Sequence, residues 1–172
     1  MPSDPKCARR LRACLVIAEP LLRSITELDA SRSPAPGKWS PKQIVGHLVD
    51  SAANNHQRFV RAALQDELVF AGYAQEEWVA VQRYQQAAWA DLLALWLAYN
   101  RHIATVMAAV PDEARTRVRA VHNLDEIATH APPSAADATL DYFMLDYVNH
   151  LVMHLRQILG TRWPATSLAS GG

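Results

Sequence analysis

Hydrophobic residues recur at intervals of three and four positions along most of the chain, which is the spacing that places them on one face of an α-helix. Glycine and proline cluster in a few short stretches between long segments rich in good helix formers. The expected helices run over about residues 4–28, 40–66, 75–110 and from 134–139 to 160. Four long helices with apolar stripes predict an all-α protein folded as a four-helix bundle.

The ends of the expected helices carry recognisable signals. Ser40 is followed by Pro41 and, three residues after the serine, by Gln43, which is the pattern of an N-terminal capping box. Gly160 can supply the left-handed residue that ends many helices, so the last helix is expected to end there. Pro20 lies within the first segment and predicts a kink or a break just before it, because proline removes a helical hydrogen bond.

The segment before the last helix, residues 112–133, has no helical period and is expected to be irregular, with a short extended piece over 117–121. No repeat or linker divides the chain, and 172 residues fit one domain. We therefore expect a single domain over residues 1–172, with a core over about 5–162 and a flexible tail over 163–172.

Charge and composition argue against several classes of function. The chain has 17 Lys and Arg and 17 Asp and Glu, without the basic excess of a nucleic-acid-binding protein. No apolar run reaches the roughly 18 residues of a membrane span, and the basic N-terminus has no apolar core of a secretory signal. Cys7 and Cys14 lie two helical turns apart, too far for a disulfide between them. We expect a cytoplasmic protein that binds neither nucleic acid nor membrane.

The last expected helix carries two histidines, His150 and His154, which lie four residues apart and therefore on one face. This spacing lets two imidazoles bind one metal ion, although core and surface histidines also occur at it. Asp146 lies one turn before His150 and can accept a hydrogen bond from its ring, which would fix the tautomer that binds metal. The alternative for Asp146 is an ordinary carboxylate on a polar seam.

A second polar line follows the second expected helix. Around the helix axis, the side chains on this line fall within about 60° of one another: His47, Asp50, Asn54 and Arg58. His56 lies about 180° from His47 and is interpreted as a surface or interface residue. Three further histidines have no partner at helical spacing and are interpreted as ordinary: His102, His122 and His130.

Three stretches follow one another in the chain: APGKWSPKQIVGHLVDSAANNHQRF, then AGYAQEEWVAVQRYQQAAWADLLALWLAYNRH, then DYVNHLVMHLRQILG. Their most specific part is a Trp-Ser helix start leading into Gly-His-Leu-x-Asp, with a later His-x-x-x-His on the last helix. In this order they resemble the DinB-like family of helical bundles, which includes the YfiT-type proteins. The resemblance covers about residues 20–160.

The resemblance implies a four-helix bundle, often paired as a homodimer, in which His47, His150 and His154 bind a divalent metal ion. Zinc and nickel are the expected ions, with water completing the coordination. Many relatives have another histidine where this chain has Met153. That position points about 100° away from His154, so the three ligands are expected to remain.

Three neutral imidazoles leave a divalent ion its full charge and an open position, as in catalytic sites. Such an ion can acidify a water or bind a thiol as thiolate. Leu151 follows His150, so the glutamate that serves as the base of helical zinc proteases is missing. Asp50 and Asp146 are the remaining carboxylates, and Asp50 is the candidate base or water-orienting residue unless it pairs with Arg58.

The resemblance also implies an activity, that of a metal-dependent S-transferase joining a low-molecular-weight thiol to a small-molecule electrophile. A metal-dependent hydrolase, a non-catalytic metal- or ligand-binding bundle and a bundle without metal are the alternatives. The candidate residues of the substrate pocket are Asn54, Arg58, Trp96 and Asn100. Trp96 fits the core equally well. Arg58 can bind a substrate carboxylate or pair with Asp50 or Asp146.

Overall fold

The computed structural model of the chain describes residues 4–134 and 137–164. Its helical elements follow one another in this order: α1 Lys6–Arg23, α2 Glu27–Ala30, α3 Pro41–Leu64, α4 Gln75–Val81, the 3₁₀ turn η1 Tyr84–Gln86, α5 Trp89–Ala109, α6 Asp112–Thr116, α7 Leu124–Ile127, α8 Leu140–Leu159 and the 3₁₀ turn η3 Gly160–Arg162. The predicted all-α class is confirmed for the described residues.

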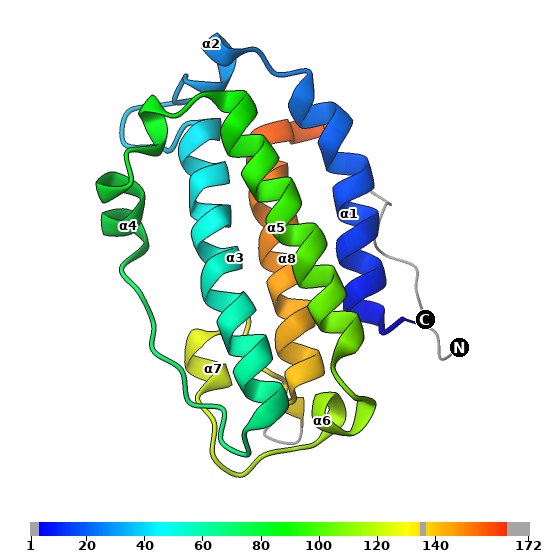
Figure 1. The fold of residues 1–172 in the computed structure, drawn as a ribbon. Coiled ribbons are helices and arrows are strands. Elements are labelled where there is room, and N and C mark those ends of the chain that lie inside the picture. The colour runs from blue at the N-terminus through cyan, green and yellow to red at the C-terminus, as the bar shows by residue number, and fades with distance from the viewer. Residues whose placement is uncertain (1–3, 135–136, 165–172) are drawn as a thin grey trace.

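Four long helices, α1, α3, α5 and α8, form the bundle (Figure 1). α5 and α8 each pack against both α1 and α3, so the order around the bundle is α1, α5, α3, α8. α1 and α3, which follow each other as long helices in the chain, therefore lie diagonally across the core. Figure 1 also shows that α3 and α5 run in the same direction, while α1 and α8 run the opposite way. The predicted four-helix bundle is confirmed, with an order that periodicity did not specify.

The predicted helix ends at α3 and α8 are confirmed. The Ser40 hydroxyl accepts a hydrogen bond from the Gln43 backbone N–H at 3.3 Å, and the Gln43 side chain accepts one from the Ser40 N–H at 2.9 Å. Thr139 caps the start of α8 by accepting from Tyr142 N–H at 3.2 Å. Gly160 has a φ of 54° at the end of α8, in the region that favours glycine.

The first predicted helix, over 4–28, is shorter in the structure and is followed by a separate turn. α1 ends at Arg23, and Pro20 lies inside its last turn, so the chain leaves the helix after the proline and not before it. Thr26 then accepts a hydrogen bond from Asp29 N–H at 3.1 Å and starts α2. A new N-cap within three residues of the helix end makes the break stable at this point.

The prediction of one continuous helix over 75–110 was wrong. The structure divides this segment into α4, η1 and α5, and Arg83 has a left-handed φ of 54° between the first two. The reason is tertiary, because the Tyr84 ring packs directly on the backbone of α3 at Gly46. A Cβ built at Gly46 would lie 2.2 Å from the ring carbons of Tyr84. A continuous helix would carry this ring away from the contact.

The segment 112–133 contains two short helices, α6 and α7, so it is less irregular than predicted. The extended piece predicted over 117–121 is not a strand among the described residues. It leads into a single parallel bridge between Leu68 and His122. Trp163 is only 4% exposed and belongs to the core, although the sequence placed it in the tail. The rest of the predicted tail, from residue 165 onward, lies outside the described residues.

The core runs along the length of the bundle. Its largest fully buried side chains include Phe59 of α3, Trp96 and Met107 of α5, and Leu11 of α1. Cys7 and Cys14 are both buried on α1 and both are free thiols, as their spacing predicted. Among the described helices, none combines the length and the apolar character needed to cross a membrane.

Candidate functional site

Three histidines from two helices converge inside the bundle. His47 lies in the second turn of α3, while His150 and His154 lie one turn apart in the second half of α8. Because α3 and α8 are antiparallel neighbours, these turns lie side by side. The Nε2 atom of His150 is 3.3 Å from Nε2 of His47 and 3.1 Å from Nε2 of His154. One ligand atom from each of the three residues lies within 4.8 Å of the others.

The spacing of these nitrogens fits a metal ion. Two imidazole nitrogens that bind zinc at its usual distance of roughly 2.0–2.1 Å, at the tetrahedral angle, lie about 3.3 Å apart. Without a cation, His150 Nε2 could donate its one proton toward only one of its two neighbours. A pair of nitrogen lone pairs would then face each other in a buried place. The residues could therefore hold a divalent ion, which satisfies all three nitrogens at once.

Burial keeps these rings in the neutral form that binds metal. Burial, with a smaller contribution from neighbouring histidines, lowers the pKa of His47 to about 4 and the pKa of His150 to about 3. The pKa of His154 is also lowered by burial, although its hydrogen bond to Gln157 acts in the opposite direction. Near neutral pH each ring is a neutral imidazole with one N–H and one free nitrogen lone pair, so no proton has to leave before a metal binds.

The orientation of His154 is fixed by a neighbour on its own helix. Its Nδ1 lies 2.9 Å from the side-chain oxygen of Gln157, which can only accept. Nδ1 is thus the protonated nitrogen, and the lone pair is on Nε2, toward the other histidines.

His47 contacts the Trp39 ring, with centroids 5.2 Å apart. The Nδ1 atom of His47 is buried without a hydrogen-bond partner among the described residues.

Asp50 lies one turn after His47 and makes its hydrogen bonds to the η1 region. Its Oδ1 accepts from the Tyr84 hydroxyl and from the Gln82 amide, each at 2.6 Å. Its Oδ2 is buried and has no partner among the described residues. Burial raises the pKa of Asp50, while the two hydrogen bonds lower it. The alternative pairing with Arg58 does not form.

Asp146 bonds to the segment before α8 instead of to His150. Its oxygens accept from the backbone N–H groups of Thr129 and His130 at 2.7 and 3.1 Å, and from His130 Nδ1 at 2.8 Å. These bonds attach residues 129–130 to the second turn of α8. The hydrogen bond predicted from the His150 ring to Asp146 is not among those of the described residues. His130, which had no sequence partner, is therefore partnered in space.

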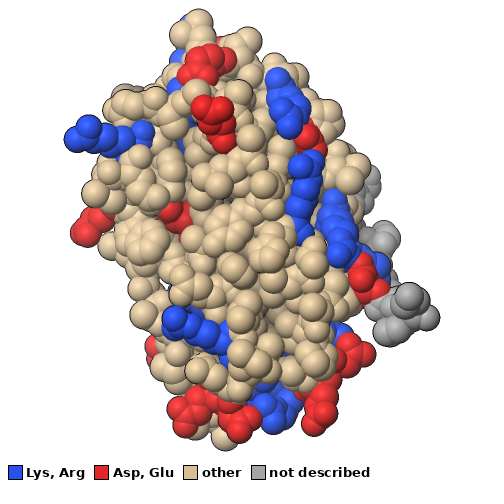
Figure 2. Space-filling view, viewed as in Figure 1, with Lys and Arg blue, Asp and Glu red and all other residues tan. Residues whose placement is uncertain are grey.

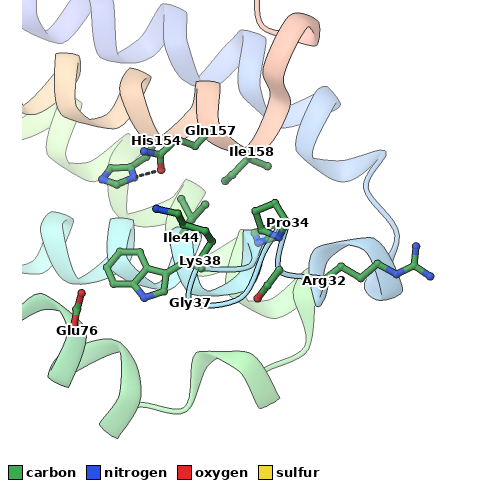
Figure 3. A pocket seen from close by; sticks show the side chains of 12 residues that line it. Arg32, Pro34, Gly37, Lys38, Ile44, Glu76, His154, Gln157 and Ile158 are labelled. Carbon is green, nitrogen blue, oxygen red and sulfur yellow. Dashed lines mark hydrogen bonds between the residues drawn. The ribbon is translucent and has the colours of Figure 1, made fainter.

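Two cavities reach the histidines from different sides. The larger, about 870 Å³, is lined by His154 and Gln157 on α8 and by residues 32–34 and 37–39 of the loop before α3 (Figure 3). Figure 3 shows the Lys38 side chain extending toward His154, while the Arg32 side chain points away from it. The smaller cavity, about 50 Å³, is lined by His150 and by polar residues of α3 and α8.

The structure separates the four predicted pocket residues. Arg58 lines the smaller cavity. Asn54 is half-buried and donates to the backbone oxygen of Asp50 at 2.9 Å. Trp96 and Asn100 are 0% exposed. Asn100 donates to the Trp96 backbone and accepts from the Tyr147 hydroxyl at 2.6 Å. Both side chains belong to the core, and neither lines the two cavities that reach the histidines, because their face of α5 turns toward α8.

His56 lies away from the three-histidine cluster, as its angle around the helix predicted. Its ring contacts His102 of α5, with centroids 4.9 Å apart, and Tyr99 at 5.7 Å. His122 lies 3.5 Å from Asp125 in the segment before α8. Met153 is 38% exposed on the outer side of its turn, next to the buried His154.

The fold and the cluster define a class of protein, a four-helix bundle that gathers three histidines from its second and last long helices. The chain belongs to the DinB superfamily, whose family model matches residues 10–158. It is also similar to the solved structure of YfiT from Bacillus subtilis, described as a probable metal-dependent hydrolase with an unusual four-helix bundle topology. The two share 19% identity with a TM-score of 0.70, over 89% of this chain and 82% of that one. No curated protein matches the chain.

Sequence reasoning missed some residues around the cluster. Tyr84 and Gln82 hold Asp50 across a break that helical periodicity did not reveal, so no local signal identified them. Lys38 and Trp39 lie in a loop, where periodicity says nothing about direction. The Trp-Ser helix start was the one signal pointing to Trp39. Gln157 was visible as the continuation of the polar stripe three residues after His154.

Proposed function

We propose that this chain is a divalent-metal-dependent enzyme in which His47, His150 and His154 bind the ion, zinc or nickel. The proposed reaction joins a low-molecular-weight thiol to a small electrophilic molecule. One observation carries the proposal: three neutral imidazoles present their Nε2 atoms to one another at 3.1 and 3.3 Å, inside the bundle and beside a large cavity.

When bound, such an ion supplies Lewis acidity, which lowers the pKa of a thiol or a water placed next to it. The chain contributes the arrangement around it. Gln157 keeps the His154 lone pair on Nε2, and burial keeps all three rings neutral. Three protein ligands leave at least one position for a reactant, as catalytic sites do.

The large cavity supports a small-molecule substrate. It reaches His154 and has an apolar wall that includes Ile44 and Ile158, with the cationic Lys38 near the histidine (Figure 3). Pockets for small molecules combine such an apolar wall with a few polar groups that fix orientation. A reactant that enters here meets the proposed metal position from the side of α8.

Hydrolysis is the second candidate, and two observations favour it. The similar structure, YfiT, is described as a probable metal-dependent hydrolase. In this chain Asp50 is buried one turn from His47, and its Oδ2 has no partner within the described part of the chain. Burial raises the pKa of Asp50, as suits a carboxylate that takes up a proton. In a hydrolase, Asp50 would orient water or act as the base. In a thiol transferase it would be a positioning residue.

A homodimer is also proposed, since the resemblance implies one. The face of the molecule over α3 and α5 offers a broad uncharged area, with acidic side chains gathered at the lower end of the view (Figure 2). Exposed apolar side chains on these helices include Leu95 at 50% and Leu64 at 83%. The mixture of both charges on this face also fits the expectation of no nucleic-acid partner.

The test starts with metal content. Protein purified without a chelator or a histidine tag is expected to hold about one divalent ion per chain. His154→Ala is expected to lose it, while His56→Ala, a histidine outside the cluster, is expected to keep it. Elemental analysis measures both. Unchanged metal in His154→Ala would remove the ligand assignment.

Activity is tested on the metal-loaded protein with a panel of low-molecular-weight thiols and electrophiles, and separately with ester and amide substrates. Product that requires both thiol and metal supports the transferase, and metal-dependent hydrolysis without thiol supports the second candidate. An ion that raises the melting temperature without any turnover would mean a structural role, and the proposed enzyme would be wrong.

A further inference from the structure

Arg58 is a buried cation that shares a small cavity with His150, and it has no carboxylate partner among the residues that the structure describes. It lies on α3, 11 residues after His47, with 8% of its surface exposed. Among the described residues its guanidinium makes one hydrogen bond, from Nη2 to the backbone oxygen of Ala71 at 2.6 Å. A buried charge is costly unless it is paired or surrounded by acceptors. The remaining donors of Arg58 therefore call for an acceptor that this part of the chain does not provide.

The other buried arginines show how the protein satisfies this group elsewhere. Arg115 forms ion pairs with two carboxylates, Asp112 and Asp141. Arg119 donates from both terminal nitrogens to backbone oxygens, at 3.0 and 3.3 Å. Arg58 has neither arrangement. Arg115 and Arg119 do keep a buried Nε without a partner among the described residues, whereas the unbonded nitrogens of Arg58 are not among such enclosed atoms. These nitrogens of Arg58 therefore face space that a ligand or water can reach.

The donors of Arg58 belong to a small polar cavity. Its volume is about 50 Å³, and its lining includes Ser51, Asn55, Arg58, Tyr73, Asp146 and His150. Since a water molecule occupies roughly 30 Å³ in the liquid, this space takes one small polar group but not a whole substrate. It suits the end of a ligand whose body lies elsewhere.

The nearby carboxylates do not pair with Arg58, although Oδ2 of Asp50 has no partner among the described residues. Asp146 lines the cavity, but its oxygens accept from Thr129 and His130. Asp50 accepts from Tyr84 and Gln82 through Oδ1. Neither forms an ion pair with Arg58. An acceptor for this guanidinium has to come from outside the described chain.

We propose that this cavity binds a carboxylate group of the substrate, with Arg58 as its anchor, so that the substrate class is a small carboxylic acid. The inference rests on the proposed function, because a substrate carboxylate matters here only if the histidines carry out chemistry. His150 lines this cavity and His154 lines the large one, so the carboxylate would lie across the histidine cluster from the large cavity. Planar guanidinium groups bind carboxylates through two parallel hydrogen bonds, which fixes orientation as well as charge. The anchor would thus place the rest of the acid toward the histidines.

The test compares an acid with its amide. Butanoate and butanamide have nearly the same shape and differ in charge. Their affinities are measured by NMR titration of the metal-free protein, from which a chelator has removed any bound ion. Butanoate is expected to bind at least tenfold more tightly to the wild type. Arg58→Gln is expected to bring the ratio close to one, and Arg58→Lys to leave part of it. Arg61→Gln is the matched control, because Arg61 is exposed one turn later on the same helix.

Equal binding of acid and amide by the wild type would overturn the proposal, and so would an unchanged preference in Arg58→Gln. If Arg58→Gln fails to fold, the wild-type ratio and Arg58→Lys still decide the question. The metal-free measurement keeps this proposal separate from the proposed function. A wild type that binds metal normally but shows no preference for the acid would count against the Arg58 anchor alone. A wild type that prefers the acid but shows no metal binding or turnover would count against the proposed function alone.

Discussion

At the scale of single residues, the cluster depends on which nitrogen of each ring carries the proton. Gln157 settles this for His154, because its side-chain oxygen lies 2.9 Å from Nδ1 and accepts a hydrogen bond from the N–H there. The partner was recognisable from the sequence, three residues on along the same stripe. The partner predicted for His150 was wrong, since Asp146 accepts hydrogen bonds from the backbone of residues 129–130 instead. Helical spacing gives the face of a residue but not its preferred partner.

Replacing Gln157 with Leu is expected to weaken metal binding about tenfold, the lower end of the usual effect of such outer partners, because Gln157 is exposed. The variant loses the acceptor that holds the His154 tautomer, while all three ligands remain. Metal titration against a competing chelator measures the affinity. Arg156→Gln, an exposed change at the preceding position, serves as control and should bind like the wild type. Equal affinity in both variants would show that Gln157 has no orienting role.

At the scale of elements, the break between α4 and α5 shapes the surroundings of the cluster. The left-handed Arg83 and the turn η1 bring Tyr84 onto Gly46, and this places its hydroxyl on Asp50. The sequence alone predicted one continuous helix here, because Gln, Arg, Tyr and Ala continue a helical pattern without glycine or proline. The gain from packing a tyrosine ring on α3 outweighs that local preference.

Gly46→Ala tests this contact. In an open helix, alanine would stabilise the fold by about 1 kcal/mol relative to glycine. Here the new methyl group would lie 2.2 Å from the Tyr84 ring, so a destabilisation of about 1–3 kcal/mol is expected. Urea unfolding of the metal-free protein gives the free energy.

The control for Gly46→Ala is Gly72→Ala, where a Cβ meets nothing within 4 Å. That variant is expected to change stability little. Tyr84→Ala destabilises the fold by itself, because the ring is buried. In that background Gly46→Ala should cost less than it does in the wild type, because the ring that the methyl group meets is gone. A stabilised Gly46→Ala protein would mean that η1 does not hold its ring against α3.

At the scale of the whole molecule, the proposed ion would join two helices that are far apart in the sequence. His47 belongs to α3, and His150 and His154 belong to α8, so a bound ion ties the second long helix to the last. A ligand that binds the folded state but not the unfolded chain stabilises the fold by mass action. The ion is therefore expected to contribute to stability whether or not it also supports catalysis.

Removing the metal is expected to lower the melting temperature. A free metal concentration of about 100 times the dissociation constant raises the free energy of unfolding by about 2.7 kcal/mol. For a chain of this size that is a shift of about 5–10 °C. Calorimetry with added zinc and with chelator measures the difference. His154→Ala should show no response to either addition, and a shift of equal size in that variant would place the stabilising ion elsewhere.

The sequence by itself determined the helical class, the capped start of α3 and the shared face of His150 and His154, because these depend on spacing along one helix and on motifs a few residues long. It joined His47 to that pair only through the family resemblance, and it left the start of α8 open between residues 134 and 139. Only the tertiary structure decided the rest. The diagonal placement of α1 and α3, the contact of Tyr84 with Gly46 and the burial of Arg58 beside Ala71 depend on how separate segments of the chain pack together. Periodicity tells which face of a helix is buried, but the partner of that face is chosen by packing among all the helices together.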